Sequence, residues 1–239
     1  MIKLEIACNS FTSCLNAFQG GANRIELFEN LHDGGCTPSY GMIKKVKQSI
    51  GLPIFVMIRP RGGDFCYTSD EIDIMLSDIE ICKQLNVDGI VFGALTEDGN
   101  VDTEICKTIL QAWKGAATFH RAIDQSNNLI KAAQTVIGLG FERILTSGGK
   151  PTALEGMAVI EKLQNTYGKE IEIMAGAGIV AENVALLLAK TKIQNIHATC
   201  KNNILFASSN AKKNIKIPEQ FSDLIEARRL KEQIEMMER

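Results

Sequence analysis

Short apolar runs alternate along the chain with longer amphipathic stretches, and this alternation is the main structural signal in the sequence. The short runs favour β-strands, whereas the stretches between them have the apolar spacing of helices. Helix start signals support this assignment, among them Thr37 followed by Pro38 and the capping-box pair Thr68 and Glu71. The predicted strands span residues 3–7, 24–28, 53–59, 89–92, 117–120, 143–146, 172–175 and 194–198.

The regular alternation predicts a parallel sheet, because each helical crossover returns the chain in the same direction. Eight units in 239 residues average about thirty residues each, which is the length of a βα unit. This count favours an α/β fold of the closed (β/α)8 TIM barrel type, with an open doubly wound sheet as the alternative. We expect one domain over residues 1–239, with an irregular loop at 200–220 and a C-terminal helix at 222–238.

Ionisable residues interrupt strands that a barrel covers on both faces. Glu5 and Glu26 alternate with apolar residues in the first two strands, and His120 and His197 lie near the ends of the fifth and eighth. Strand alternation directs such side chains into the barrel, and barrel enzymes carry their chemistry at the C-terminal ends of the strands. We therefore predict a site at this mouth, with these four residues and Asp124 as catalytic candidates.

A second group of residues near the same mouth suits an anionic ligand. Arginine binds carboxylates and phosphates through two parallel hydrogen bonds, and glycine-rich turns present backbone amides to anions. The predicted substrate-binding residues are Arg59, Arg61, Thr118, Arg121, Ser147, Gly148, Gly176 and Gly178. We expect a small anionic molecule as partner, with the alternative that the charges form ion pairs that only fill the barrel.

Composition narrows the function further. The 26 basic and 28 acidic residues give a net charge of −2, so we expect neither nucleic acid nor a membrane as partner. No apolar run approaches the ~20 residues of a membrane span. The seven cysteines form no CxxC pair, which favours reduced thiols in a cytoplasmic protein. No motif indicates a nucleotide cofactor.

The strings IRPRGGDF, TFHRA and LTSGG, together with shorter ones between about residues 3 and 199, resemble the CutC family of copper homeostasis proteins. The resemblance implies a TIM-type barrel, a cytoplasmic location and a homo-oligomer. It also implies Cu(I) bound by two cysteines, one ending the first strand and one following the RIEL segment. Those positions hold Ala7 and Phe28 here, which offer no soft ligand, so the candidate metal ligand is the neighbouring Cys8.

Three functions remain open from the sequence. The resemblance implies copper homeostasis. The charged mouth favours an enzyme, either a lyase, an isomerase or a hydrolase, acting on a small anionic or phosphorylated metabolite. A barrel retained as a binding or scaffold protein is the third, because a fold shared by many chemistries does not choose among them.

Overall fold

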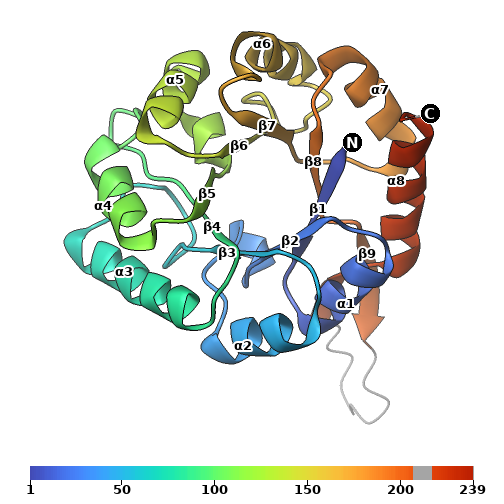
Figure 1. The fold of residues 1–239 in the computed structure, drawn as a ribbon, viewed down its shortest axis with the longest axis horizontal. Coiled ribbons are helices and arrows are strands. Elements are labelled where there is room, and N and C mark those ends of the chain that lie inside the picture. The colour runs from blue at the N-terminus through green and yellow to red at the C-terminus, as the bar shows by residue number, and fades with distance from the viewer. Residues whose placement is uncertain (207–216, 239) are drawn as a thin grey trace.

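In the computed structural model, residues 1–206 and 217–238 are described, with residues 202–206 and 217–221 described by their backbone alone. Eight parallel strands close into a barrel in which β8 pairs with β1, and helices surround it (Figure 1). The barrel strands are β1 (Lys3–Cys8), β2 (Arg24–Leu27), β3 (Ile54–Met57), β4 (Gly89–Phe92), β5 (Ala116–Phe119), β6 (Arg143–Thr146), β7 (Glu172–Ala175) and β8 (Asn195–Ala198). The predicted (β/α)8 barrel of one domain is confirmed.

One helix or more follows each barrel strand. The helices are α1 (Phe11–Gln19), η1 (Leu31–Asp33), α2 (Tyr40–Ser49), α3 (Ser69–Gln84), α4 (Thr103–Trp113), η2 (Arg121–Gln125), α5 (Leu129–Leu139), α6 (Met157–Tyr167), α7 (Ala181–Thr191) and α8 (Leu224–Met236). The predicted capping box of Thr68 and Glu71 is confirmed at the start of α3. The start signal at Thr37 is displaced, because Ser39 caps α2 by accepting a hydrogen bond from the Met42 amide.

Alternation along each strand divides the core into two parts. Leu4 and Ile6 of β1 belong to the large apolar cluster that packs between the sheet and the helices. Ala7 of the same strand belongs to a small apolar cluster inside the barrel, together with Phe28 and Met57. The polar interior residues of the neighbouring strands lie beside this small cluster, because Ala7 is opposite Glu26 in the sheet register. The interior is therefore partly polar, as the strand pattern predicts.

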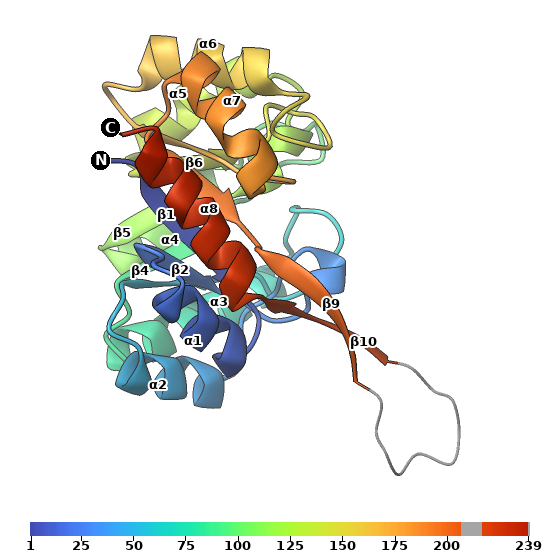
Figure 2. The same cartoon turned by 90° about the vertical axis from the view of Figure 1, so that its right-hand side faces the viewer.

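The chain leaves the barrel after β8 and forms two antiparallel strands, β9 (Lys201–Phe206) and β10 (Ile217–Ser222). They project from the end of the barrel opposite the two termini (Figure 2). The pair corrects the irregular loop expected at 200–220, because its antiparallel register extends from Lys201 opposite Ser222 to Phe206 opposite Ile217. The rest of that expected loop, residues 207–216, lies outside the described residues.

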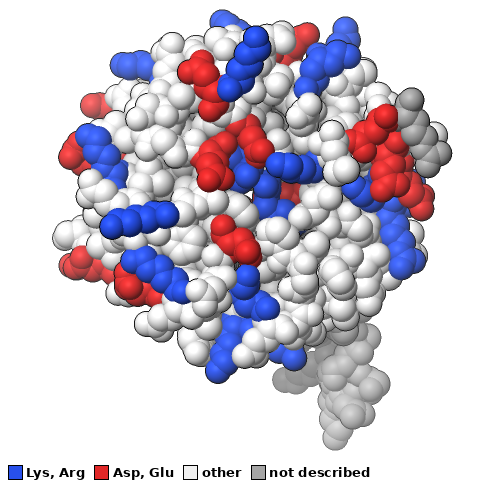
Figure 3. All heavy atoms as spheres, viewed as in Figure 1, with Lys and Arg blue, Asp and Glu red and all other residues white. Residues whose placement is uncertain are grey.

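The last helix, α8, packs against α1 and α7 and completes the outer layer. It begins two residues later than the expected helix at 222–238, because the Asp223 side chain caps it by accepting hydrogen bonds from the Ile225 and Glu226 amides. Lys, Arg, Asp and Glu side chains are interspersed over the face of the molecule in Figure 3. Among the described helices, none has the length and apolar character needed to span a bilayer.

Candidate functional site

The C-terminal mouth of the barrel encloses a cavity of about 290 Å³. Its walls are mostly apolar and come from the barrel strands and the loops that follow them. The principal apolar side chains are Ala7, Phe28, Leu31, Met57, Phe65 and Leu145. The polar side chains at the cavity are Glu26, His120, Arg121, His197 and Thr199. The location agrees with the predicted mouth site, and an apolar cavity with a few polar groups is the usual form of a small-molecule site.

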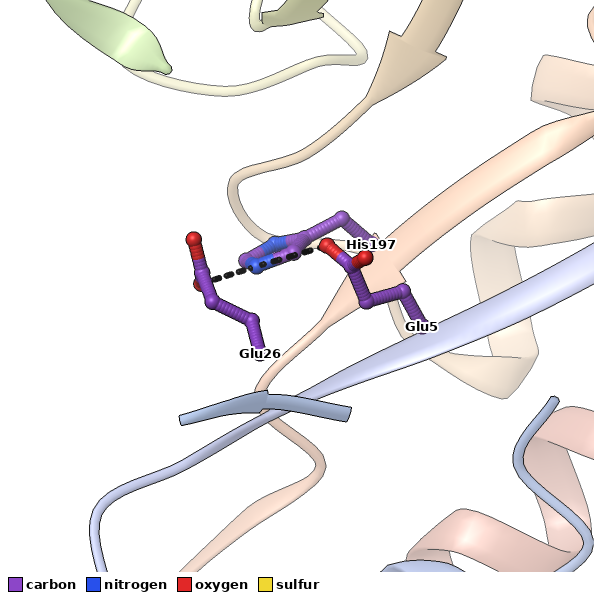
Figure 4. Close-up of side chains that lie close together, drawn as sticks. All are labelled: Glu5, Glu26 and His197. Atoms are coloured by element: carbon purple, nitrogen blue, oxygen red, sulfur yellow. Dashed lines mark hydrogen bonds and ion pairs between the residues drawn. The ribbon is translucent and has the colours of Figure 1, made fainter. Parts of the chain in front are cut away.

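Glu26 and His197 line this cavity and meet Glu5 there, and each of the three residues comes from a different strand (Figure 4). They converge because β1 pairs with both β2 and β8, and Glu5 is opposite His197 in the register. The Nε2 atom of His197 lies 2.6 Å from Oε2 of Glu26 and 3.9 Å from Oε1 of Glu5. All three side chains are buried. The structure thus brings together three of the five predicted catalytic residues.

The electrostatics of these residues are governed by burial and by neighbouring charge. Burial alone would lower the pKa of His197, but the hydrogen-bonded carboxylate of Glu26, with a contribution from Glu5, raises it above the usual value. Burial alone would raise the pKa of Glu5, but the positive charges of Arg24, His197 and Arg143 hold it below its usual value. These two shifts favour the ionised form of Glu5 and the protonated form of His197.

Two carboxylate oxygens of the group remain unused. Oε1 of Glu5 and Oε1 of Glu26 are buried and have no hydrogen-bond partner among the described residues. One ligand atom from each of Glu5, Glu26 and His197 lies within 4.8 Å of the others. A buried polar atom without a partner costs about 1–3 kcal/mol, so such atoms indicate a missing partner. The group is a candidate site for a metal ion.

His120 is at the cavity on the opposite side of the barrel, after β5. Its Nδ1 accepts a hydrogen bond from the Ala122 amide at 3.3 Å, which leaves the ring proton on Nε2. Burial and the neighbouring Arg59 and Arg121 lower the pKa of His120 to about 3, so the ring is neutral. Nε2 is buried without a hydrogen-bond partner among the described residues. His120 therefore offers a neutral N–H donor to a ligand.

The two arginines predicted after β3 are engaged by the protein itself. Arg59 donates to the backbone carbonyls of Asp33, Gly35 and Gly63 at 2.7–2.8 Å, so it joins the loops that follow β2 and β3. Arg61 pairs with Asp64 and Glu71. Neither arginine is among the residues that line the cavity.

Arg121 is the predicted arginine that reaches the cavity. Its Nε donates to Asp124 at 2.9 Å and its Nη2 to the Ser147 hydroxyl at 3.0 Å. The predicted catalytic residue Asp124 thus serves to orient Arg121.

The backbone amides of the glycine-rich turn after β6 are also bonded to side chains of the protein itself. The Asp124 carboxylate accepts hydrogen bonds from the backbone amides of Ser147 and Gly149, and the Gly148 amide donates to Thr146 Oγ1. An internal carboxylate thus occupies the place that we expected an anionic ligand to take. Of the predicted glycines, Gly178 lines the cavity.

Gly176, the other glycine predicted for the turn after β7, has a packing role. A Cβ atom there would lie 2.7 Å from Leu145 Cδ1 and 3.1 Å from His197 Nδ1, so the missing side chain makes room for the imidazole. The turn thus supports the site without binding the ligand through Gly176.

A separate ionic layer lies below the cavity, toward the N-terminal ends of the strands. Arg24 pairs with Glu5, and Arg143 pairs with Glu172 at 2.8 Å. The predicted binding residue Thr118 accepts a hydrogen bond from Arg143 in this layer, away from the cavity. Neither Arg24 nor Arg143 is among the residues predicted for the site, although each begins a strand and is in phase with the inward-facing positions.

The cysteine chemistry at the mouth does not fit Cu(I). Ala7 and Phe28 line the cavity but have no ligand atom. Cys8 is fully buried among the outward-facing core residues, and its thiol donates to the Ile6 carbonyl at 3.5 Å. Burial and the neighbouring Cys14 raise the pKa of Cys8 well above its usual value, which disfavours the thiolate. The predicted metal ligand therefore lies outside the cavity.

The comparisons with known proteins agree on one family. The sequence model of the CutC family matches residues 2–202. The Homo sapiens copper homeostasis protein cutC homolog is 44% identical over 200 residues, covering 83% of this chain and 73% of its own. A CutC family protein of Pasteurella multocida is 43% identical, covering 84% of this chain and 82% of its own. A CutC crystal structure from Streptococcus agalactiae has a TM-score of 0.79 at 35% identity, covering 83% of this chain and 99% of its own. The chain therefore belongs to the CutC family.

Proposed function

We propose that this protein serves copper homeostasis by binding a divalent metal ion between Glu5, Glu26 and His197. The assignment to copper homeostasis rests on the names of its relatives. One observation carries the site: three ligand atoms lie within 4.8 Å of one another, and two buried carboxylate oxygens there have no partner. An ion bound by these atoms would satisfy both oxygens.

The donor set decides which ion fits. Two carboxylates and one imidazole suit divalent ions, and Cu²⁺ binds such nitrogen and oxygen ligands more tightly than Zn²⁺ or Ni²⁺. Cu(I) prefers thiolates and thioethers, which the positions of Ala7 and Phe28 do not supply. The chain's own contribution is a buried, rigid arrangement: three neighbouring strands fix the ligands. We therefore assign the site to Cu²⁺ rather than Cu(I).

Calorimetric titration of the purified protein with Cu²⁺, in competition with a chelator of known affinity, tests this assignment. We expect one bound ion per chain, and at least tenfold weaker binding in His197→Gln, because the substitution removes the imidazole ligand. Cys8→Ser is the matched control, since its side chain is buried outside the cavity. We expect this control to bind Cu²⁺ as the wild type does.

The opposite pattern would overturn the proposal. If Cu²⁺ binding survives His197→Gln unchanged, or is lost in Cys8→Ser, the ligands are not those assigned here. Replacement of both family positions, in Ala7→Cys/Phe28→Cys, provides a second comparison. We expect this variant to gain tight Cu(I) binding that the wild type lacks, because it supplies two thiolates at the mouth.

We also propose a cytoplasmic location, supported by seven cysteines that are all free thiols. Cell fractionation with an antibody to the protein tests it. The homo-oligomer that the family resemblance implies stays a prediction, for which sedimentation equilibrium is the direct measurement.

A further inference from the structure

The cavity above the metal-ligand group is larger than an ion needs. Its volume is about 290 Å³, whereas a water molecule's share of the liquid is about 30 Å³. Its walls include Phe28, Phe65 and Leu145, and apolar walls contribute nothing to holding a hydrated ion. Such walls favour an organic molecule, whose burial releases water from apolar surface. The space therefore suits a small ligand with an apolar body.

His120 specifies one polar feature of that ligand. The side chain is 4% exposed, and its Nε2–H has no hydrogen-bond partner among the described residues. Because Nδ1 is occupied by the Ala122 amide, Nε2 acts as a donor, and it requires an acceptor oxygen from outside the protein. The edge-to-face contact with Phe65, at 4.8 Å between ring centroids, fixes the ring at the cavity wall.

Arg121, the next residue in the chain, adds positive charge on the same side of the cavity. It lines the cavity, and Asp124 and Ser147 hold its guanidinium through Nε and Nη2. No hydrogen bond from Nη1 occurs among the described residues, so a donor remains for a ligand. The carboxylate at the cavity, Glu26, is hydrogen-bonded to His197 on β8. The charge distribution thus favours a negative group beside His120 and Arg121.

We propose that the cavity binds a small organic carboxylate, with its carboxylate on His120 and Arg121 and its apolar body against Phe28, Phe65 and Leu145. This ligand is distinct from the metal ion of the proposed function, because it uses none of Glu5, Glu26 or His197. The site recognises the carboxylate through one neutral donor and one charged donor.

Benzoate is a suitable probe, with benzamide of nearly the same shape as the neutral comparison. We expect saturable benzoate binding to metal-free protein in the presence of a chelator, measured by calorimetry, and at least tenfold weaker binding of benzamide. Arg121→Gln should weaken benzoate binding about tenfold or more, since it removes a charge-assisted hydrogen bond. The control is Arg229→Gln, an arginine of similar exposure on α8, which should bind as the wild type does.

His120→Phe keeps the ring and removes the donor, and we expect it also to weaken benzoate binding at least tenfold. Arg121→Gln decides the question alone if the buried substitution fails to fold, because Arg121 is half exposed. Equal binding of benzoate and benzamide, or unchanged binding in Arg121→Gln, overturns the proposal. Benzoate binding that appears only after Cu²⁺ is added overturns it too, because the carboxylate then lies on the metal. Loss of Cu²⁺ binding in His197→Gln is measured separately, so the two proposals fail independently.

Discussion

The two halves of the barrel interior differ in how their charges are satisfied. Toward the N-terminal ends of the strands, Arg24 pairs with Glu5, and Glu172 pairs with both Arg143 and Lys3. The Phe55 ring lies against both arginines, with centroid distances of 4.9 and 5.1 Å. Each of these charges has an opposite charge beside it, and the lower half forms an ion-pair network in which Glu5 leaves Oε1 free toward the metal-ligand group.

The upper half, toward the C-terminal ends of the strands, contains buried polar groups without hydrogen-bond partners. Oε1 of Glu26 and Nε2 of His120 are buried without hydrogen-bond partners among the described residues, and a cavity of about 290 Å³ adjoins both side chains. Charge inside a barrel is therefore not by itself a sign of function, because a paired network fills space and stabilises little. Unsatisfied groups beside a cavity are the more informative feature.

Removal of one partner from the lower network should have the largest effect. Arg24→Met leaves Glu5, 1% exposed, without its ion-pair partner, and we expect a loss of about 3–5 kcal/mol in the free energy of unfolding. Urea denaturation at pH 7 measures it. The double variant Glu5→Met/Arg24→Met should recover most of the loss, since no buried charge remains. A loss below about 1 kcal/mol in the single variant would show that the lower half does not act as an ion-pair network.

Asp124 at the mouth should behave as a stabilising residue, although it lies beside the cavity. Its carboxylate accepts hydrogen bonds from the Ser147 and Gly149 amides and the Thr146 hydroxyl. We expect Asp124→Ala to lower the free energy of unfolding by about 2–3 kcal/mol, because the amide of the buried Ser147 and the amide of Gly149 lose a charged acceptor. Asp124→Asn, which keeps one acceptor oxygen, should lose less. Equal losses in the two variants would contradict the capping role.

The barrel and the inward direction of Glu26 and His197 could be predicted because both depend on local periodicity. Alternation within a strand fixes the face of each side chain, and eight repeats fix the closure. The partners of Arg59 could not be predicted, since its carbonyl acceptors belong to two separate loops. The filled turn after β6 was hidden for the same reason, because Asp124 comes from the preceding βα unit.

The β9–β10 pair could not be predicted from the sequence for a different reason. Its strands are joined by a ten-residue connection, 207–216, and the short Asn-Gly or Gly-containing turn that identifies a hairpin in a sequence is missing from that segment. The polar residues of segment 200–220 therefore indicated a loop. Long-range pairing between two such segments is decided by tertiary context rather than by local propensity.

The pH dependence of stability should reflect the lowered pKa of His120 in the folded protein. Its pKa falls from 6.5 to about 3 on folding, so the unfolded chain binds a proton between these values and the native protein does not. Stability therefore decreases as the pH falls below about 6.5, and we expect His120 to account for about 2 kcal/mol of the loss between pH 7 and pH 5. Comparison of urea denaturation of the wild type and His120→Gln at both pH values isolates this contribution. His32→Gln, at an exposed position, is the control and should keep the wild-type dependence.

Replacing one glutamate by glutamine in each half of the barrel interior should give the smallest effect on stability and the most direct comparison of the two halves. Glu26→Gln removes a charge but keeps an oxygen that can accept the hydrogen bond from His197, now at 2.6 Å. It also replaces a buried carboxyl group that has one oxygen without a partner, so we expect the free energy of unfolding to change by less than about 1 kcal/mol. Glu5→Gln should cost more, because it leaves the buried Arg24 without its counter-charge.

Urea denaturation of the two glutamine variants under one set of conditions measures this difference, and it separates two explanations of the barrel interior. If Glu5→Gln costs more than Glu26→Gln, the ion pair of Glu5 with Arg24 is needed for the fold in addition to the place of Glu5 in the metal-ligand group, whereas Glu26 is retained at little benefit to stability. A residue that stability does not require, placed beside a cavity, is then explained by the ligand it binds. Equal costs would mean that Glu26 is as structural as Glu5, and the contrast between the two halves would not hold.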